Sequence, residues 1–309
     1  MPEWAGALLG SRKVLEAKYS TRKGKYPQFA ASLRLTSHFF FYNLRIIFGF
    51  LFFPMATQRK MLRGFDLRRI KDAEWVVGVD EAGRGSLAGP VVAGAVLVRR
   101  DFYEGPWCRR NASLINDSKQ LDERRREAVF ALLPELLAEG CAFYATGQAG
   151  AEEVDLHNVL GATRLAMRRA LMAVQELASG RVRLPEKGIA EGLFSGVAPS
   201  VPTALIMVDG LPLRPFPYEH TAIVQGDCKS LLIALASIVA KVTRDRLMAG
   251  LDARHPDYGF ARHKGYGTLQ HRAALREHGP CELHRASFLG RILQDEPEPD
   301  MQAGFDFAV

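Results

Sequence analysis

The chain has 309 residues, 48% of them hydrophobic, which is enough for one large or two modest domains. Its 41 lysine and arginine residues outnumber 34 acidic ones, giving a formal net charge of +7 that is compatible with a polyanionic partner. Four cysteines are scattered without a Cys-x-x-Cys pair. That spacing argues against a zinc site or a disulfide framework and suits a reducing cytosol.

Residues 1–70 differ in composition from the rest of the chain. An aromatic and apolar run from His38 to Pro54 is interrupted by Asn43 and Arg45, and it is shorter than the about 20 residues that a spanning helix needs. Three interpretations stay open: a weak membrane anchor, an export signal, or a stretch upstream of a true start at Met55. We favour the third, because the chain runs from Met55 through a basic lead-in directly to the first predicted strand.

The residues that organise the chain begin at a β-branched stretch, Val76–Val79, which predicts a buried strand. Two adjacent carboxylates, Asp80 and Glu81, follow it, and a glycine-rich turn, Gly83-Arg84-Gly85, comes next. Backbone without Cβ atoms can approach a ligand closely. A second apolar run, Val91–Val98, predicts another strand. A hairpin turn with solvated acids is the alternative interpretation.

Two later segments repeat this arrangement of an acid after a strand. Thr203–Val208 is apolar and ends at Asp209, and a strand beginning at Ala222 leads to Asp227, ahead of a helix predicted over Lys229–Leu251. Each acid taken alone is more often a turn residue than a ligand. Together they predict a magnesium site, because hard divalent cations prefer carboxylate oxygens and two such ions catalyse phosphodiester cleavage.

A further strand is predicted over Ala142–Gln148, and a long helix over Val159–Leu177. The segment from Ser179 to Pro202 is rich in glycine and proline and predicts a surface insertion. Another helix is expected to open near Asn116-Asp117-Ser118-Lys119 and to continue to Leu137, capped by Ser118 or Asp117. The alternative to a plain cap is that Ser118 and Lys119 hold a backbone phosphate at the helix N-terminus.

Short motifs follow one another in a fixed order between about residues 75 and 288. They are Asp80-Glu81-Ala82-Gly83-Arg84-Gly85 with Gly89-Pro90, Asn116-Asp117-Ser118-Lys119, Asp209-Gly210, Asp227-Cys228-Lys229-Ser230, the run from Ala236 to Asp245, the run from Tyr258 to Thr268, and His284-Arg285-Ala286-Ser287-Phe288. In this order they resemble bacterial ribonuclease HII. The arginine between the glycines favours this family over ribonuclease HIII, whose matching turn lacks it.

The resemblance implies an α/β fold of the ribonuclease H type, with a mixed central β-sheet flanked by helices and a small helical region from about residue 252. It also implies an endoribonuclease that cleaves the RNA strand of RNA–DNA hybrids and nicks duplex DNA 5′ to an embedded ribonucleotide. Hydrolysis with two Mg²⁺ or Mn²⁺ ions would leave 5′-phosphate and 3′-hydroxyl ends. A catalytically silent nucleic-acid-binding protein of the same fold is the alternative.

The resemblance also assigns roles to individual residues. Asp80, Glu81 and Asp209 match the metal ligands, and Asp227 matches the fourth catalytic carboxylate. The turn residues Gly83, Arg84 and Gly85 match the group that reads the ribose 2′-hydroxyl. Tyr266 matches the tyrosine that packs under the deoxyribose after the ribonucleotide; an ordinary core or surface aromatic is its alternative.

Charged residues near the C-terminus have two interpretations. Lys241, Arg244 and Asp245 lie within about a turn of one another on the predicted helix, as a solvated face or as part of the site. A basic cluster follows, and we expect it to contact the phosphates of a duplex. Its members are His255, Arg262, His263, Lys264 and Arg272.

The sequence thus predicts an N-terminal extension over residues 1–70, a catalytic domain over 71–288, and an acidic, disordered tail over 289–309. Within the tail, Gln302–Phe307 faintly resembles a peptide that binds a sliding clamp. We expect a cytoplasmic monomer.

Overall fold

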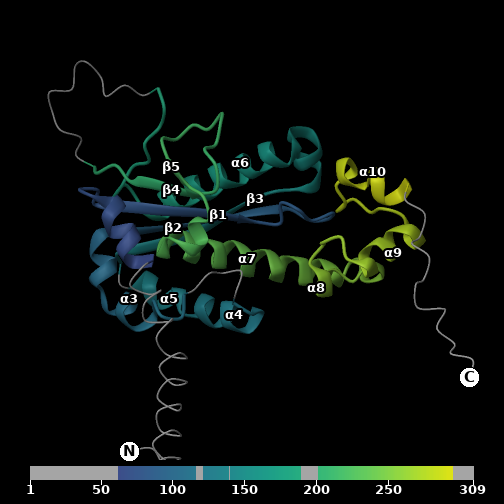
Figure 1. Cartoon of the computed structure of the whole chain (residues 1–309), viewed down its shortest axis with the longest axis horizontal. Helices are drawn as coiled ribbons and strands as arrows, with labels where there is room; N and C mark the ends of the chain where they lie inside the picture. The colour runs from purple at the N-terminus through teal and green to yellow at the C-terminus, as the bar shows by residue number, and fades with distance from the viewer. Residues whose placement is uncertain (1–61, 116–120, 139, 189–200, 295–309) are drawn as a thin grey trace, which may run out of the picture. The chain divides into compact units, whose positions relative to one another are not determined.

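A computed structural model describes residues 62–115, 121–138, 140–188 and 201–294 (Figure 1). One mixed sheet lies at its centre, with the strand order β3-β2-β1-β4-β5. Strands β1, β2 and β3 pair antiparallel, whereas β1, β4 and β5 pair parallel. Their bounds are β1 Trp75–Ala82, β2 Val91–Arg99, β3 Ala142–Ala149, β4 Leu205–Asp209 and β5 Thr221–Ile223. This arrangement confirms the predicted mixed sheet.

The central strands are buried on both faces, as their continuous apolar sequences predict. In β1 only Glu81 is partly exposed, and in β2 only Arg99 is exposed. Strand β1 runs on to Ala82, so Asp80 and Glu81 lie within the strand and not in the turn after it. β5 differs from expectation: it ends at Ile223, and Asp227 lies in a short 3-10 helix, η2 (Gly226–Cys228).

Two long helices cover the two faces of the sheet (Figure 1). Alternate residues of β1 belong to different clusters: Val76 packs with α7 (Leu231–Asp252), and Val77 packs with α6 (Ala151–Leu177). α6 begins earlier than predicted and contains a kink at Asn158, where φ is 55°. The Asn158 side chain accepts the N–H groups of Leu160 and Gly161, so it caps the segment that the sequence predicted as the helix.

Helix α7 lies very close to the sheet because a glycine of β2 faces it. A Cβ atom on Gly94 would stand 2.3 Å from the carbonyl oxygen of Ala236 in α7. Both groups are backbone atoms in regular structure, so neither can move aside cheaply. Because Gly94 has no side chain, α7 can pack directly on the sheet, and its side chains lie close to the end of β1.

The segment before β3 differs from the single capped helix that the sequence predicted. It begins with η1 (Arg100–Glu104) and α3 (Pro106–Asn111), and continues with α4 (Glu123–Ala131) and α5 (Leu133–Ala138). The cap of α4 is Asp122, whose side chain accepts the Arg125 N–H at 2.7 Å, so the predicted capping by Ser118 or Asp117 is wrong. Ser118 and Lys119 themselves lie outside the described residues.

A helical region follows α7, as predicted. It consists of η3 (Pro256–Tyr258), α8 (Phe260–His263), α9 (Leu269–His278) and α10 (Ala286–Gln294). Phe260, Leu275 and Leu289 are part of its own apolar cluster. Because α10 continues to Gln294, residues 289–294 are helical and differ from the tail that the sequence predicted.

The predicted extension also ends earlier than expected. Residues 62–70 are helical, and Leu62 and Ile70 are buried in the same core cluster as Val76, so they belong to the folded domain. The questions about Met55, the Phe39–Phe53 run and the clamp-like peptide fall outside the described residues. So do residues 189–200, half of the predicted 179–202 insertion.

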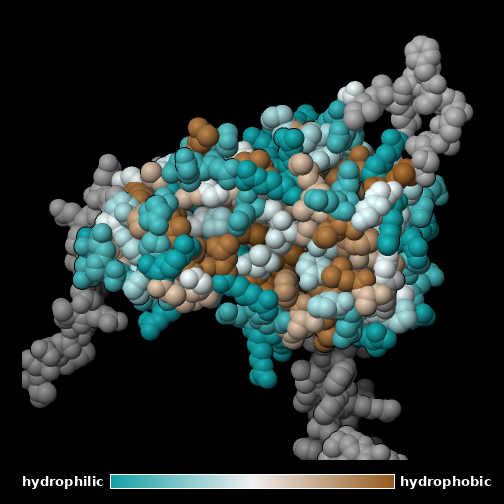
Figure 2. Space-filling model, turned by 180° about the vertical axis from the view of Figure 1, so that it is seen from behind, coloured by the Kyte–Doolittle hydropathy of each residue, from teal (hydrophilic) through white to brown (hydrophobic). Residues whose placement is uncertain are grey.

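Among the described residues, no helix is both long and apolar enough to cross a bilayer. The face opposite to that of Figure 1 is largely hydrophilic, with hydrophobic side chains in patches between the polar ones (Figure 2). Exposed apolar residues include Leu156, Leu211 and Leu269. Scattered exposed leucines of this kind are normal on protein surfaces.

Candidate active site

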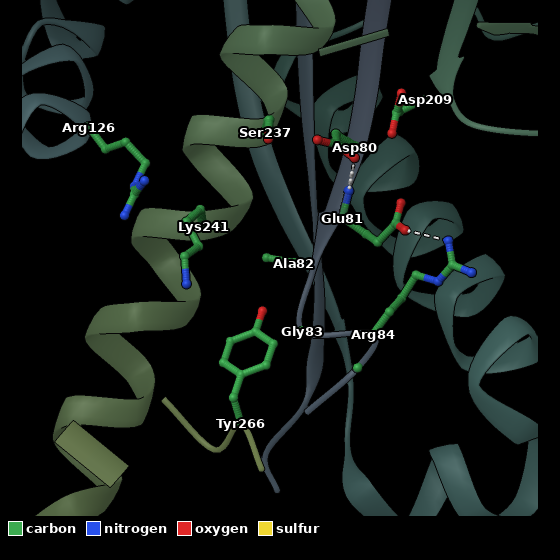
Figure 3. A pocket seen from close by; sticks show the side chains of 11 residues that line it. Asp80, Glu81, Ala82, Gly83, Arg84, Arg126, Asp209, Ser237, Lys241 and Tyr266 are labelled. Atoms are coloured by element: carbon green, nitrogen blue, oxygen red, sulfur yellow. Dashed lines mark hydrogen bonds and ion pairs between the residues drawn. The ribbon is translucent and has the colours of Figure 1, made fainter. Parts of the chain in front are cut away.

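Three carboxylates meet at the edge of the sheet where β1 and β4 end. The parallel register pairs Val79 with Val208, so Asp80 and Asp209 follow at neighbouring positions of adjacent strands. Glu81 comes next along β1, and all three acids line one cavity of about 470 Å³ (Figure 3). The remaining lining residues are Ala82, Gly83, Arg84, Gly85, Arg126, Ser237, Lys241 and Tyr266. The structure thus brings together most of the residues that the sequence selected.

Asp80 is the most deeply buried of these three acids, at 4% exposure. Burial raises its pKa well above the usual range, and the neighbouring charges of Glu81 and Asp209 raise it further. Two hydrogen bonds act in the opposite direction and lower the Asp80 pKa. One comes from the Glu81 N–H, which donates to Asp80 Oδ1 at 2.7 Å, and the other comes from Ser237 of α7. Acids this close repel one another when they are ionised.

This donor set fits a hard divalent cation. Asp80, Glu81 and Asp209 present carboxylate oxygens, which Mg²⁺ and Mn²⁺ prefer over softer ligands. A bound cation would also relieve the repulsion that raises the pKa of Asp80. Sites of this kind for Mg²⁺ use few carboxylates and leave positions for water and phosphate oxygens.

Asp227 follows a residue that contacts this cluster, but it does not line the cavity. It is fully buried in η2, directly after Gly226, whose N–H donates to Asp209 Oδ1 at 2.5 Å. The loop that carries Asp227 therefore fixes the position of the Asp209 carboxylate. The role of Asp227 as a fourth catalytic carboxylate stays a prediction.

The glycine-rich turn forms another wall of the cavity. Gly83 has a φ of 90°, and a Cβ atom there would stand 2.0 Å from Nε of Arg244. Only glycine can adopt this positive φ and leave room for the Arg244 side chain without strain. The next residue, Arg84, is half exposed, and its Nη1 donates to Glu81 Oε1 at 3.1 Å. The turn therefore places one cation and bare backbone beside the acids.

Two buried arginines hold this turn in place. Arg244 of α7 donates to the carbonyls of Pro90, Ala88 and Lys264 at 2.9, 3.1 and 2.8 Å. Its Nη2 also donates to Ser86 Oγ at 2.8 Å. Arg244 is fully buried, so the interpretation of its helix face as solvated is wrong for this residue.

Arg285, just before α10, binds the same turn from the C-terminal region. It donates to the carbonyls of Gly83, Arg84 and Gly89 at 2.8, 2.9 and 2.8 Å. Burial lowers the pKa of Arg285 to about 10, and the positive charge of Arg244 contributes to that shift. In the sequence, Arg285 was noted only as part of the motif His284–Phe288, and its burial against the turn was not predicted.

Tyr266 lies opposite the acids, with its hydroxyl directed towards the end of β1 (Figure 3). The Lys241 ammonium and the Arg244 guanidinium both lie 5.4 Å from its ring centroid. Lys241 also pairs with Asp245 at 2.7 Å. This placement excludes the simple core interpretation of Tyr266, because its ring faces the cavity.

Sequence reasoning missed the cavity residues Ser237 and Arg126 as site members, and it left Lys241 open between a solvated face and the site. Ser237 and Lys241 project from successive turns of α7, and Arg126 reaches in from α4, where it also donates to the Leu121 carbonyl (Figure 3). Ser237 and Lys241 lie four residues apart within the motif run from Ala236 to Asp245, and this spacing was the signal for a shared helix face.

The residues of the predicted basic cluster do not all lie on the surface. His263 is buried, its Nε2 donates to the Tyr258 carbonyl at 2.7 Å, and its Nδ1 accepts the Gly265 N–H at 3.2 Å. It therefore fixes the local backbone and cannot contact phosphates. Arg262 and Arg272 are exposed and remain available to a duplex.

Comparison with known proteins gives one consistent result. The family model for ribonuclease HII matches residues 77–190 and 198–290. A ribonuclease HII of Syntrophotalea carbinolica is 43% identical over 215 residues, which cover 70% of this chain and 85% of that protein. One of Burkholderia vietnamiensis is 43% identical over 227 residues, covering 73% and 87%.

The solved structure of ribonuclease H2 from Pyrococcus horikoshii is similar in fold, with a TM-score of 0.50 and 23% identity. The match covers 71% of this chain and 97% of that one. The order of motifs, the acid-lined cavity and the relatives agree: the chain belongs to the ribonuclease HII family of nucleases.

Proposed function

We propose that the protein is an endonuclease that cleaves RNA in RNA–DNA hybrids and nicks duplex DNA on the 5′ side of an embedded ribonucleotide. One observation carries the proposal. The carboxylates of Asp80, Glu81 and Asp209 share a cavity with the Gly83–Gly85 turn and Tyr266. Groups suited to hold a hydrolytic metal and groups suited to inspect a sugar therefore face the same space.

Asp80, Glu81 and Asp209 would hold Mg²⁺ or Mn²⁺, with Asp227 as the fourth carboxylate of the site. Two such ions supply a Lewis acid for the phosphate and a more acidic water for in-line attack. Since water attacks, the cleaved strand would keep a 5′-phosphate and a 3′-hydroxyl. Ser237 and the Glu81 N–H hydrogen-bond Asp80 and orient its carboxylate before substrate arrives.

The turn supplies the selection for ribose. Arg285 donates to the carbonyls of Gly83 and Arg84, and Arg244 donates to Ser86 Oγ directly after the turn, so the backbone at Gly83–Gly85 is fixed before a ligand binds. Rigid polar groups distinguish a 2′-hydroxyl well, because that hydroxyl is the one group that separates a ribonucleotide from DNA. The Tyr266 ring would pack under the next deoxyribose and disfavour a further hydroxyl there.

Cations around the cavity suit the phosphates on either side of the scissile bond. Lys241 and Arg126 line the cavity, and Arg84 lies beside the acids. Phosphate contacts fix register without reading sequence, which matches an enzyme that acts wherever a ribonucleotide occurs. Ser118 and Lys119 belong to the same proposal as phosphate-binding residues.

The decisive experiment is cleavage of a DNA duplex that carries one ribonucleotide, with Mg²⁺ or Mn²⁺. The parent should nick 5′ to the ribonucleotide, and Asp209→Asn should lose that activity while it keeps its fold. An all-DNA duplex of the same sequence is the control substrate. Activity retained in Asp209→Asn would refute the metal assignment, and a folded parent without any nick would favour the binding-only alternative.

We further propose that the protein is a cytoplasmic monomer. Binding of the Gln302–Phe307 segment to a sliding clamp is a separate proposal. A peptide of residues 295–309, titrated onto a clamp against a copy with Phe305 and Phe307 replaced by alanine, tests it directly.

A further inference from the structure

A second group of metal-binding side chains lies in the C-terminal region, away from the acid-lined cavity. The donor atoms of His255, Cys281 and Glu282 all lie within 4.8 Å of one another. None of these three residues lines the cavity. They come from two segments on either side of α9, so only the folded chain brings them together.

We propose that His255, Cys281 and Glu282 form a binding site for Zn²⁺ in which a water molecule completes the coordination. Thiolate, imidazole and carboxylate are all established zinc ligands. Tetrahedral zinc with bonds of about 2.0–2.3 Å needs donor atoms roughly 3.3–3.7 Å apart. The His255 Nε2 and Glu282 Oε1 atoms are already 3.2 Å apart, and the Cys281 thiol lies within 4.8 Å of both donor atoms.

The choice of metal follows from the softness of the ligands. A thiolate and an imidazole favour Zn²⁺ over Mg²⁺, Ca²⁺ or Mn²⁺, which prefer oxygen donors throughout. The active-site acids have the opposite preference. The chain would therefore separate two metals by chemistry, with the hard ion at Asp80, Glu81 and Asp209 and the softer one at Cys281.

Packed aromatic rings hold the two segments that carry the ligands next to each other. Tyr258 stacks on Phe260 with their centroids 5.4 Å apart, and its hydroxyl donates to the Gly279 carbonyl at 2.8 Å. Phe260 also lies edge-on to the His255 ring at 6.3 Å. The frame thus fixes His255 and the start of the Cys281 segment before any ion binds, which lowers the cost of binding.

His284 orients the cysteine from the inner side. The Cys281 N–H donates to His284 Nδ1 at 3.0 Å, so the proton of His284 is on Nε2, and the Cys281 Sγ atom lies 3.2 Å from the same Nδ1. That Nε2–H lies 3.0 Å from Nε2 of His271, whose Nδ1–H donates to the Tyr266 carbonyl at 3.0 Å. Both rings are therefore engaged inside the fold, and His284 acts as an outer-shell partner and not as a fourth ligand.

This chain of hydrogen bonds gives the site a connection to the cavity. It runs from Cys281 through His284 and His271 to the backbone of Tyr266, which lines the cavity. A zinc ion that joins η3 to the segment before α10 would also restrain Arg285, which binds the glycine-rich turn. We expect the ion to stabilise the C-terminal region and to leave the carboxylates unchanged.

Cobalt substitution tests the proposal without relying on activity. Co²⁺ added to the purified full-length chain should produce tetrahedral ligand-field bands and a thiolate charge-transfer band at one equivalent. Carboxylates alone give no thiolate band, so the active site cannot account for it. The Cys281→Ser variant should lose that band, and His255→Gln should weaken binding at least about 10–100-fold, as loss of an outer-shell partner already does.

Cys228→Ser is the matched control, since Cys228 is the other half-exposed cysteine. It should keep the band, and Asp209→Asn should keep it as well. Competition with Zn²⁺ should remove the band, whereas Mg²⁺ in excess should not. No charge-transfer band in the parent, or an unchanged band in Cys281→Ser, would overturn the proposal.

Discussion

Arg244 and Arg285 bind the carbonyl oxygens of two successive residues. Arg244 Nη2 donates to Ala88 O at 3.1 Å, and Arg285 Nη2 donates to Gly89 O at 2.8 Å. One arginine comes from α7 and the other from the segment before α10. The segment that follows the glycine-rich turn is therefore held by two parts of the fold that are far apart in the chain.

The first prediction concerns Arg285. Arg285→Lys should lower the free energy of unfolding by about 2–4 kcal/mol, because one ammonium cannot replace the fork that binds Gly83, Arg84 and Gly89. Urea unfolding followed by fluorescence measures this change. Arg246→Lys is the control: Arg246 makes an exposed ion pair with Glu127, and its loss should change stability by less than about 1 kcal/mol. Equal effects of the two variants would contradict the prediction.

The second prediction concerns Asp66, a buried acid outside the active site. Its pKa is raised from 3.8 to about 7 because burial disfavours the charged carboxylate. Hydrogen bonds from Ser230, Leu232 and Tyr103 lower the pKa but only partly offset the effect of burial. As pH rises from about 4 to 7, the unfolded chain ionises this carboxyl while the folded chain keeps it protonated. Asp66 therefore costs stability as pH rises through this window, by about 4 kcal/mol at most.

Asp66→Asn removes that cost. Its stability relative to the parent should increase between pH 4 and 7 in urea titrations made at each pH. Asp101→Asn should differ from the parent by a constant amount between pH 4 and 7 and should show the opposite sign only below about pH 4, because hydrogen bonds from Arg99 lower the pKa of Asp101. Its effect should be small, since Asp101 is exposed. A difference between Asp66→Asn and the parent that stays constant with pH would refute the assignment.

The third prediction concerns the repulsion among the catalytic acids. With EDTA present, Asp80→Asn should melt about 2–4 °C above the parent, the shift that about 1 kcal/mol gives in a domain of this size. Its neutral amide removes the buried charge that Glu81 and Asp209 oppose. Added Mg²⁺ should raise the melting temperature of the parent and not that of the variant. A variant that melts below the parent in EDTA would show that the acids do not oppose one another.

The fourth prediction concerns phosphate contacts. Duplex binding by Asp209→Asn, measured by fluorescence anisotropy, should weaken as salt rises. Adding Lys241→Ala or Arg126→Ala should reduce the slope of log affinity against log salt by about one each. Arg246→Ala, also on α7 but outside the cavity lining, serves as the control and should leave the slope unchanged. Equal slopes for all three variants would exclude these phosphate contacts.

Much of the fold and of the site could be predicted from local sequence. The apolar runs Val76–Val79 and Val91–Val98 specified buried strands, because a sheet covered on both faces needs such runs. The acids that follow Val79 and Val208 predicted a cation site, because parallel strand ends meet at one edge of a sheet. The order of the motifs indicated the family that the comparisons then established.

Other features depend on contacts between distant residues, and no local pattern reports them. Arg244 is one charge among several on a helix until the glycine-rich turn surrounds it. The scattered cysteines argued against zinc, yet the fold places Cys281 beside His255 and Glu282.

The sequence by itself determined the strands, the acids that end them and the family, because apolar runs and motif order are local properties. Only the tertiary structure decided which polar groups are buried, which turn they hold and which side chains share a site. The physical reason is that a buried charge needs partners from elsewhere in the chain, and packing alone selects them.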